Sequence, residues 1–201
     1  MAWDATTSTL IFGENDAVLV DTLTTADEAE ALARWIELHH RNLATIYVTH
    51  MHIDHYGGLS VLQRHFPDAR AIATPKSVEL MPKTPAELEV YRKFLPGLPT
   101  EITVPEPYDK DVFTLEGQEL HIIEQGTTDA DASTSVYVPS IDLVVGGDVF
   151  YNQCHMMVAA STPESRANWI ADLDRLTALN PRWRLYPDRA SNQTWLMFGL
   201  G

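Results

Sequence analysis

Three of the eight histidines lie within the stretch THMHIDHYGG, residues 49–58. His50 and His52 alternate on an extended segment that follows a strand-like run, so both imidazoles should point to the same face. The chain then turns, and Asp54 and His55 can reach a neighbouring point. Imidazoles together with a carboxylate are ligands for zinc, iron or manganese. The stretch therefore predicts a metal site, against the alternative of a polar loop that contains several histidines by chance.

The elements that would position this cluster follow an alternating pattern. Short apolar runs alternate with helical patterns, which favours an α/β arrangement. We expect strands over residues 8–12, 17–20, 46–48, 71–74, 120–124, 134–138, 143–145 and 183–186. We expect helices after the capping box Thr25–Glu28, over residues 59–66 and 86–94, and after the helix start at residues 161–164, where Trp169, Ile170, Leu173, Leu176 and Leu179 would form the inner face.

Two other segments have a predicted structural role. Gly57 and Gly58 follow the histidines, and we expect them to let the backbone bend sharply behind the ligands. The stretch from Pro75 to Pro107 contains seven prolines. It is either a surface connector or a cover over a site, since long connections often serve function.

The segment Thr49–His55 resembles the HxHxDH signature of the metallo-β-lactamase-fold superfamily. The resemblance extends to Val20-Asp21, to the turn Gly126–Asp129 and to Gly147-Asp148, which come in the family's order. It implies a four-layer αβ/βα sandwich of the metallo-β-lactamase type. Residues 1–201 would form a single such domain, shortened at both ends.

The resemblance also implies a two-metal centre. His50 and His52, with a third histidine, would hold one ion, and Asp54 and His55, with a late histidine, would hold the second. Asp148 would bridge the two. Zinc is the expected metal, as one or two ions, with manganese or iron as alternatives. A metal-activated water, which Asp54 would also orient, would then hydrolyse a small ester, lactone, thioester or lactam.

Two positions depart from the family pattern. Thr127 takes the place of the third histidine, and Asp188 takes that of the late histidine. The first ion would keep two histidines and Asp148, with Thr127 or water completing its shell, whereas Asp188 would join the second set. Such changes shift the preference away from zinc toward manganese, iron or magnesium. For Asp129 and Asp131, in the same loop, we expect a role in the turn itself.

The remaining histidines have separate expected roles. His155 is expected in the pocket as a catalytic residue, in contact with substrate or with the ligands, because it follows Asp148 closely. We expect His65 to be solvated at a helix end and His121 to be a core or face residue of a strand. Cys154, the single cysteine, is expected to serve in packing.

The bulk composition limits the function classes. The chain has 201 residues and a formal net charge of −14, so an acidic surface would repel nucleic acid. We see no signal-peptide pattern and no membrane-spanning run, and a single cysteine suits a reducing compartment, so the cytoplasm is expected. The leading hypothesis is a hydrolase of a small-molecule substrate. The alternatives are a catalytically weakened binding or regulatory protein, and an iron-dependent sulfur oxygenase of this fold.

Overall fold

The structure, a computed structural model, describes residues 6–151, 155–185 and 195–200. Its strands are β1 (Ser8–Phe12), β2 (Asp16–Val20), β3 (Asn42–Tyr47), β4 (Arg70–Ala73), β5 (Glu106–Pro107), β6 (Val112–Leu115), β7 (Gln118–Gly126), β8 (Ser133–Val138), β9 (Leu143–Val145), β10 (Trp183–Leu185) and β11 (Trp195–Gly199). Its helices are α1 (Ala26–Glu37), α2 (Ile53–Tyr56), α3 (Leu59–His65), α4 (Pro75–Leu80), α5 (Pro85–Phe94) and α6 (Pro163–Ala178), with short 3-10 turns η1 (Pro139–Ile141) and η2 (Gly147–Val149).

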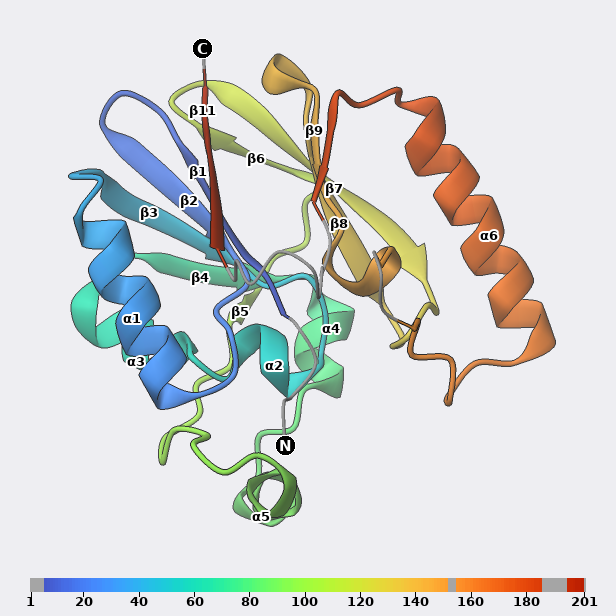
Figure 1. The fold of residues 1–201 in the computed structure, drawn as a ribbon, viewed down its shortest axis with the longest axis horizontal. Coiled ribbons are helices and arrows are strands. Elements are labelled where there is room, and N and C mark those ends of the chain that lie inside the picture. The colour runs from blue at the N-terminus through green and yellow to red at the C-terminus, as the bar shows by residue number, and fades with distance from the viewer. Residues whose placement is uncertain (1–5, 152–154, 186–194, 201) are drawn as a thin grey trace.

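The strands form two sheets that pack face to face between helices (Figure 1). The first sheet has the order β11-β1-β2-β3-β4-β5, and the second has the order β10-β9-β8-β7-β6. Helices α1 and α3 cover the outer face of the first sheet, and α6 covers that of the second (Figure 1). The layers are therefore helix, sheet, sheet and helix, which confirms the predicted four-layer sandwich.

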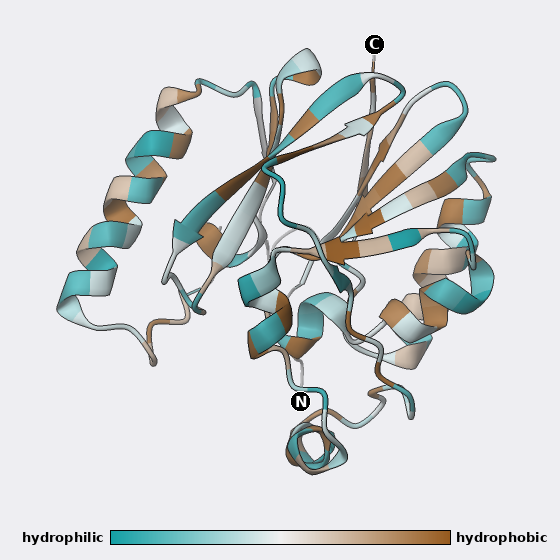
Figure 2. Cartoon of the chain, turned by 180° about the vertical axis from the view of Figure 1, so that it is seen from behind, coloured by the Kyte–Doolittle hydropathy of each residue, from teal (hydrophilic) through white to brown (hydrophobic). Residues whose placement is uncertain are grey.

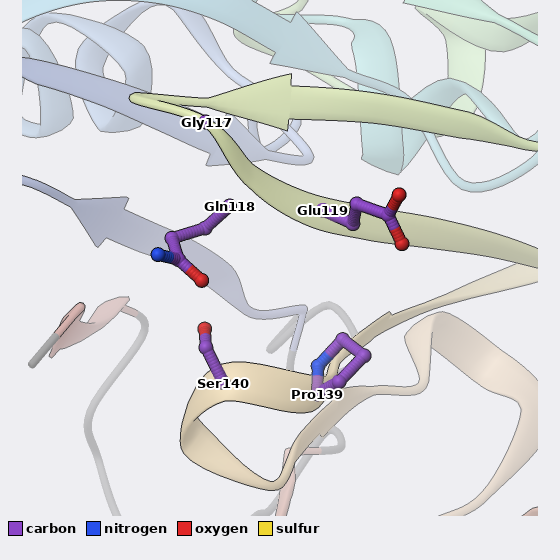
Figure 3. Close-up of a pocket in the computed structure, with 5 residues that line it drawn as sticks. All are labelled: Gly117, Gln118, Glu119, Pro139 and Ser140. Carbon is purple, nitrogen blue, oxygen red and sulfur yellow. The ribbon is translucent and has the colours of Figure 1, made fainter.

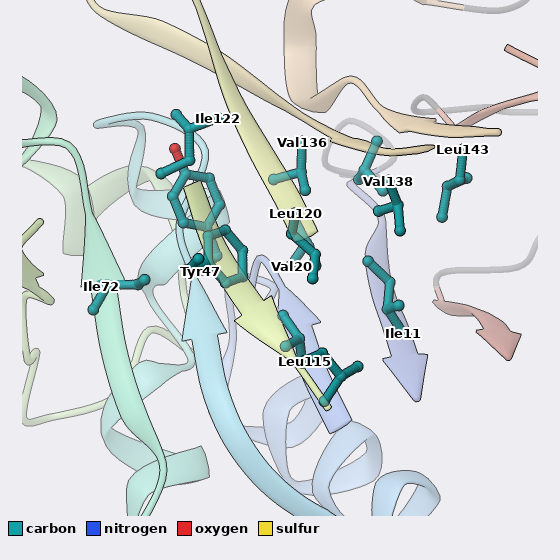
Figure 4. Close-up of a cluster of buried hydrophobic side chains, with 13 residues drawn as sticks. Ile11, Val20, Tyr47, Ile72, Leu115, Leu120, Ile122, Val136, Val138 and Leu143 are labelled. Atoms are coloured by element: carbon teal, nitrogen blue, oxygen red, sulfur yellow. The ribbon is translucent and has the colours of Figure 1, made fainter. Parts of the chain in front are cut away.

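The main hydrophobic core lies between the two sheets (Figure 4). Side chains that point inward from both sheets meet there, because alternate residues of a strand share one face. Tyr47 of the first sheet stacks on Phe113 of the second, with ring centroids 5.5 Å apart. The Tyr47 hydroxyl also lies 2.7 Å from the Thr134 hydroxyl, so its polar end is satisfied. This contact fixes the end of β3, from which the histidine stretch begins.

Helix α1 forms as the sequence predicts. The Thr25 hydroxyl accepts a hydrogen bond from the Glu28 amide, and the Glu28 carboxylate accepts one from the Thr25 amide, so both free donors are satisfied. The apolar stripe of Ala29, Leu32, Ala33 and Ile36 is buried against the first sheet. In Figure 2 the hydrophobic colour is concentrated in the central strands.

The expected inner face of α6 is wrong at one position. Trp169 and Leu176 are buried, and Leu173 and Leu179 are partly buried against the second sheet. Ile170, however, is 61% exposed. Successive helical residues are turned by about 100°, so the residue next to Trp169 lies off the stripe that runs through positions 169, 173 and 176.

Three strands, β5, β6 and β11, were not predicted from the sequence. Strand β6 pairs with β7, and the C-terminal strand β11 pairs in parallel with β1. Trp195 of β11 stacks on Trp35 of α1, with centroids 5.8 Å apart. The apolar tail is thus an edge strand, which a local pattern cannot show because its partner lies at the other end of the chain. Among the described residues, no helix is long and apolar enough to span a membrane.

The proline-rich segment from 75 to 107 supports the histidine stretch from one side. Its apolar residues, including Leu88 and Leu95, pack with Ile53 and Tyr56 of α2. The Tyr56 hydroxyl donates to the Pro82 carbonyl at 2.9 Å. Since α2 carries Asp54 and His55, this packing fixes the position of both side chains.

Candidate metal centre

Four loops bring polar side chains to one edge of the sandwich. Asp21 follows β2, the histidine stretch follows β3, Asp129 follows β7 and Asp148 follows β9. The two sheets are joined directly at this edge, because the Thr49 carbonyl accepts hydrogen bonds from the amide and the hydroxyl of Thr134. The carboxyl ends of strands from both sheets therefore converge on the histidines.

Glycines allow the close approach of these loops, although not in the way expected for Gly57 and Gly58. Both have helical backbone angles, with φ of −55° and −77°. A Cβ on Gly57 would lie 2.6 Å from the Thr24 carbonyl oxygen. A Cβ on Gly58 would collide with the Thr22 carbonyl oxygen. These positions need glycine because the loop after β2 packs on them, and not because the backbone bends there.

Gly147 does require an unusual backbone conformation. Its φ is +53°, and a Cβ there would lie 2.8 Å from the Thr49 hydroxyl. Only glycine adopts this conformation without strain while leaving room for Thr49. The turn directs the following residue, Asp148, toward the histidines.

The first group of possible metal ligands is made of His50, His52 and Asp129. One carboxylate oxygen of Asp129, Oδ2, lies 3.5 Å from His50 Nε2 and 2.9 Å from His52 Nδ1. Asp129 and His50 are buried, whereas the His52 side chain is 32% exposed. His52 is therefore the most solvent-exposed member of this group.

The second group is made of His50, His55 and Asp148. His55 Nε2 lies 3.3 Å from Asp148 Oδ1 and 3.7 Å from Asp54 Oδ2. The rings of His50 and His55 have centroids 4.1 Å apart, so the two groups are contiguous and share His50.

Four buried atoms in these groups lack a hydrogen-bond partner: His50 Nε2, His55 Nε2, Asp129 Oδ2 and Asp148 Oδ1. A buried polar atom without a partner costs about 1–3 kcal/mol, and more when it is charged. A divalent cation would satisfy atoms of both kinds, since neutral imidazole nitrogens and carboxylate oxygens are its usual ligands. The described residues therefore fit a metal.

Asp21 sets which nitrogen of two histidines carries the proton. His55 Nδ1 lies 2.8 Å from Asp21 Oδ2, so it must donate, which leaves Nε2 free to bind a metal. The Thr49 hydroxyl donates to the same carboxylate at 2.9 Å and lies 3.0 Å from His50 Nδ1. Because that hydroxyl has only one hydrogen, His50 Nδ1 must donate to it, and His50 Nε2 is also left free.

The pKa of His55 and the pKa of the acids around it depend on one another. Burial disfavours a charged imidazole, but Asp21, Asp148 and Asp54 together outweigh it and raise the pKa of His55 well above its ordinary value. Burial likewise opposes ionisation of Asp148, yet His55 and His50 hold its pKa below the usual range. Without a metal, the protonated His55 therefore carries a hydrogen on both ring nitrogens and supplies part of the positive charge that the acids require; a bound metal would displace the proton from Nε2.

Burial and neighbouring charges also act on the pKa values of the first ligand group, His50, His52 and Asp129. Burial and the neighbouring His55 lower the pKa of His50, so this ring is neutral near pH 7. Burial opposes the charge on Asp129, but His50 and His52 more than compensate and keep its pKa low. A neutral imidazole beside an ionised carboxylate is the state in which both can bind a cation.

Tyr151 is a further member that the sequence did not indicate. Its hydroxyl donates to Asp148 Oδ2 at 2.8 Å, which leaves Oδ1 facing the histidines. Burial, and next the charge of Asp148, raise the pKa of Tyr151, so the hydroxyl keeps its proton. This tyrosine orients the carboxylate of the second group.

The structure brings together His50, His52, Asp54, His55 and Asp148, the expected ligands that it describes. The sixth, Asp188, and also Cys154, lie outside the described residues. His155 is exposed, and no hydrogen bond or ion pair within the described part of the chain joins it to the cluster.

Other expected positions lie elsewhere. The Thr127 hydroxyl donates to Asp131 at 2.7 Å and does not complete either ligand group. His65 was expected to be solvated, but it contacts Glu30 and Glu37 and is only 26% exposed. His121 lies on a strand face beside Glu119, as expected.

Two surface hollows lie apart from the histidines. One, of about 460 Å³, is lined by Gly117, Gln118, Glu119, Pro139 and Ser140 (Figure 3). The other, of about 320 Å³, is lined by seven residues that include Lys76 and Thr127. Neither lining contains a histidine, so neither is the metal centre.

The fold is a four-layer sandwich with side chains at one edge that could hold a metal. The model of the metallo-beta-lactamase superfamily matches residues 1–187, and the chain belongs to that superfamily. No curated protein sequence matches it.

Solved structures share the fold at low sequence identity. A metallo-beta-lactamase from Pontibacter korlensis has a TM-score of 0.68 and 19% identity, over 89% of this chain and 77% of that one. A metallo-beta-lactamase family protein from Thermus thermophilus has a TM-score of 0.66 and 22% identity, over 89% and 66%. The DIM-1 metallo-beta-lactamase, exposed to ceftazidime, has a TM-score of 0.65 and 17% identity, over 89% and 74%.

Proposed function

We propose that this protein is a metal-dependent hydrolase of a small ester, lactone, thioester or lactam. The observation that carries the proposal is the convergence of four buried ligand atoms without hydrogen-bond partners, two from imidazoles and two from carboxylates. Superfamily membership supports it, and the net charge of −14 argues against a nucleic-acid substrate.

In this proposal, some residues would bind the metal ions and another would accept a proton. His50 and His52 would hold one ion, His55 and Asp148 a neighbouring one, and zinc, manganese or iron(II) are the candidate metals. When bound, such ions polarise an acyl carbonyl and bring the pKa of water toward neutrality. Asp54, whose side chain is 15% exposed, would hold a proton from that water at a carboxylate oxygen.

The test is His52→Ala, because His52 is the most exposed of the clustered imidazoles and its loss should disturb folding least. We expect turnover of chromogenic esters, thioesters, lactones and lactams to fall by at least about 100-fold. Elemental analysis should show less bound metal, and unfolding in chelator should still be a cooperative transition, which shows that the variant folds. The matched control is His121→Ala, which removes a partly exposed imidazole outside the centre. Folded, metal-free parent protein, or full activity of His52→Ala, would refute the proposal.

A second candidate is a catalytically weakened relative that acts as a binding or regulatory module. Its support is the commitment of the Thr127 hydroxyl to Asp131, together with an aspartate at position 188. The double variant Thr127→His, Asp188→His distinguishes the two. If it gains metal and activity that the parent lacks, the second candidate is correct.

A further inference from the structure

The loop after β7 places Asp129, and not Thr127, against the histidines. Gly126 has a φ of +73° and follows an irregularity in the pairing of β7 with β8. The Thr128 hydroxyl then donates to Asp129 Oδ1 at 2.9 Å, and the Thr128 amide donates to the Ala130 carbonyl. These bonds hold one oxygen of the Asp129 carboxylate within the loop and leave Oδ2 directed at the imidazoles.

The environment of Oδ2 is that of a ligand atom. Asp129 is 4% exposed, and Oδ2 has no hydrogen-bond partner of its own although His52 Nδ1 is only 2.9 Å away. A protonated His52 can pair with this oxygen, and when the imidazole is neutral both atoms are available to a cation. The unpartnered His50 Nε2 lies 3.5 Å from the same oxygen.

We propose that Asp129 Oδ2 is the third protein ligand of the first ion, in the position that the family resemblance assigned to residue 127. The ligand set becomes two imidazoles and one carboxylate. The inference deepens the proposed function and depends on its metal-binding part, but not on hydrolysis.

This set changes the metal preference. Replacing one imidazole with a carboxylate makes the ligand set harder, which favours manganese(II) and iron(II) more than a set of three imidazoles does. Zinc still binds more tightly in absolute terms, in keeping with the general order of divalent metals. With Asp129 as a ligand, the ratio of zinc affinity to manganese(II) affinity should therefore be smaller than at a site with a third imidazole.

The first experiment compares Asp129→Asn with Asp131→Asn, which makes the same chemical change in the same loop. Each protein is stripped of metal and titrated with zinc and with manganese(II) in competition with a chelating dye. We expect Asp129→Asn to weaken binding of the first ion by at least about 100-fold and Asp131→Asn to leave it unchanged. Equal affinities in the two variants would overturn the inference.

The second experiment uses Asp129→His, which supplies the imidazole. We expect the ratio of zinc to manganese(II) affinity to rise at least about tenfold above that of the parent. A folded variant with an unchanged ratio would overturn the proposed preference; if the larger ring prevents folding, the asparagine pair still tests ligation. Metal binding as expected without turnover of any substrate would refute hydrolysis and leave this inference intact.

Discussion

Asp21→Asn tests the most specific consequence of the geometry. The buried Asp21 carboxylate accepts from the Thr49 amide at 2.8 Å, from the Thr49 hydroxyl at 2.9 Å and from His55 Nδ1 at 2.8 Å. Asparagine has nearly the same shape, and it tolerates the positive φ of 62° at this position. Its single oxygen can still accept from the Thr49 amide. Its NH2 group, however, then faces the His55 Nδ1 donor.

The size of the effect follows from these contacts. A hydrogen bond to a charged group contributes about 1.5–3 kcal/mol. The bond from His55 becomes a donor–donor contact, whereas the Thr49 hydroxyl, 3.1 Å from Oδ1, can still donate to the remaining oxygen. The contact can relax because removal of the Asp21 charge lowers the pKa of His55, which can then become neutral with its remaining proton on Nε2. We therefore expect the metal-free protein to lose about 2–4 kcal/mol of unfolding free energy. Because a proton on Nε2 blocks ligation, affinity at the His55 site should fall about 10–100-fold, or about 1.4–2.7 kcal/mol.

The assay has two parts. Urea unfolding in the presence of chelator gives the stability of the metal-free protein, and competition with a chelating dye gives the metal affinity. Asp142→Asn is the matched control, since Asp142 is exposed and has a similar φ of 51°. If Asp21→Asn bound metal within about twofold of the control, Asp21 would not determine which imidazole nitrogen is free, and the reasoning would be refuted.

Two further predictions concern Tyr151 and His65. Tyr151→Phe removes the hydroxyl that orients Asp148, so metal affinity should fall about tenfold with little change in stability, which the same titration would measure. Contacts led by the carboxylate of Glu37 raise the pKa of His65, so its protonated form is the one stabilised by folding. This contribution is complete below the ordinary histidine pKa, is lost as pH rises through the raised value, and should not exceed about 0.5 kcal/mol because the site is on the surface. A histidine NMR titration unaffected by Glu37→Gln would contradict it.

Much of the fold follows from local pattern. The capping box at Thr25 and the apolar stripe behind it place α1 correctly, and alternation places most strands of both sheets. The strands that were not predicted, β5, β6 and β11, are short or depend on distant partners. Ile170, expected on the inner face, is exposed because it lies about 100° around the helix from its buried neighbour Trp169.

In the candidate metal centre too, some residues could be predicted from the local sequence and others could not. His50, His52, Asp54 and His55 are consecutive enough that one extended segment and one helical turn bring them together. Asp129, by contrast, lies in a loop where Thr127 looked equally near. The choice between them depends on the turn at Gly126 and on the hydrogen bonds of Thr128, which no residue spacing encodes.

The sequence by itself therefore determined the class of fold, the histidine cluster and the presence of Asp148 after a strand. Those features are local, since each depends on the type and spacing of residues near one another in the chain. Tertiary structure alone decided that Asp21 directs the protons of two imidazoles, that Tyr151 orients Asp148 and that Asp129 faces the histidines. Each of these needs loops from several strands to meet at one edge, and the packing of the two sheets, not any single segment, makes them meet.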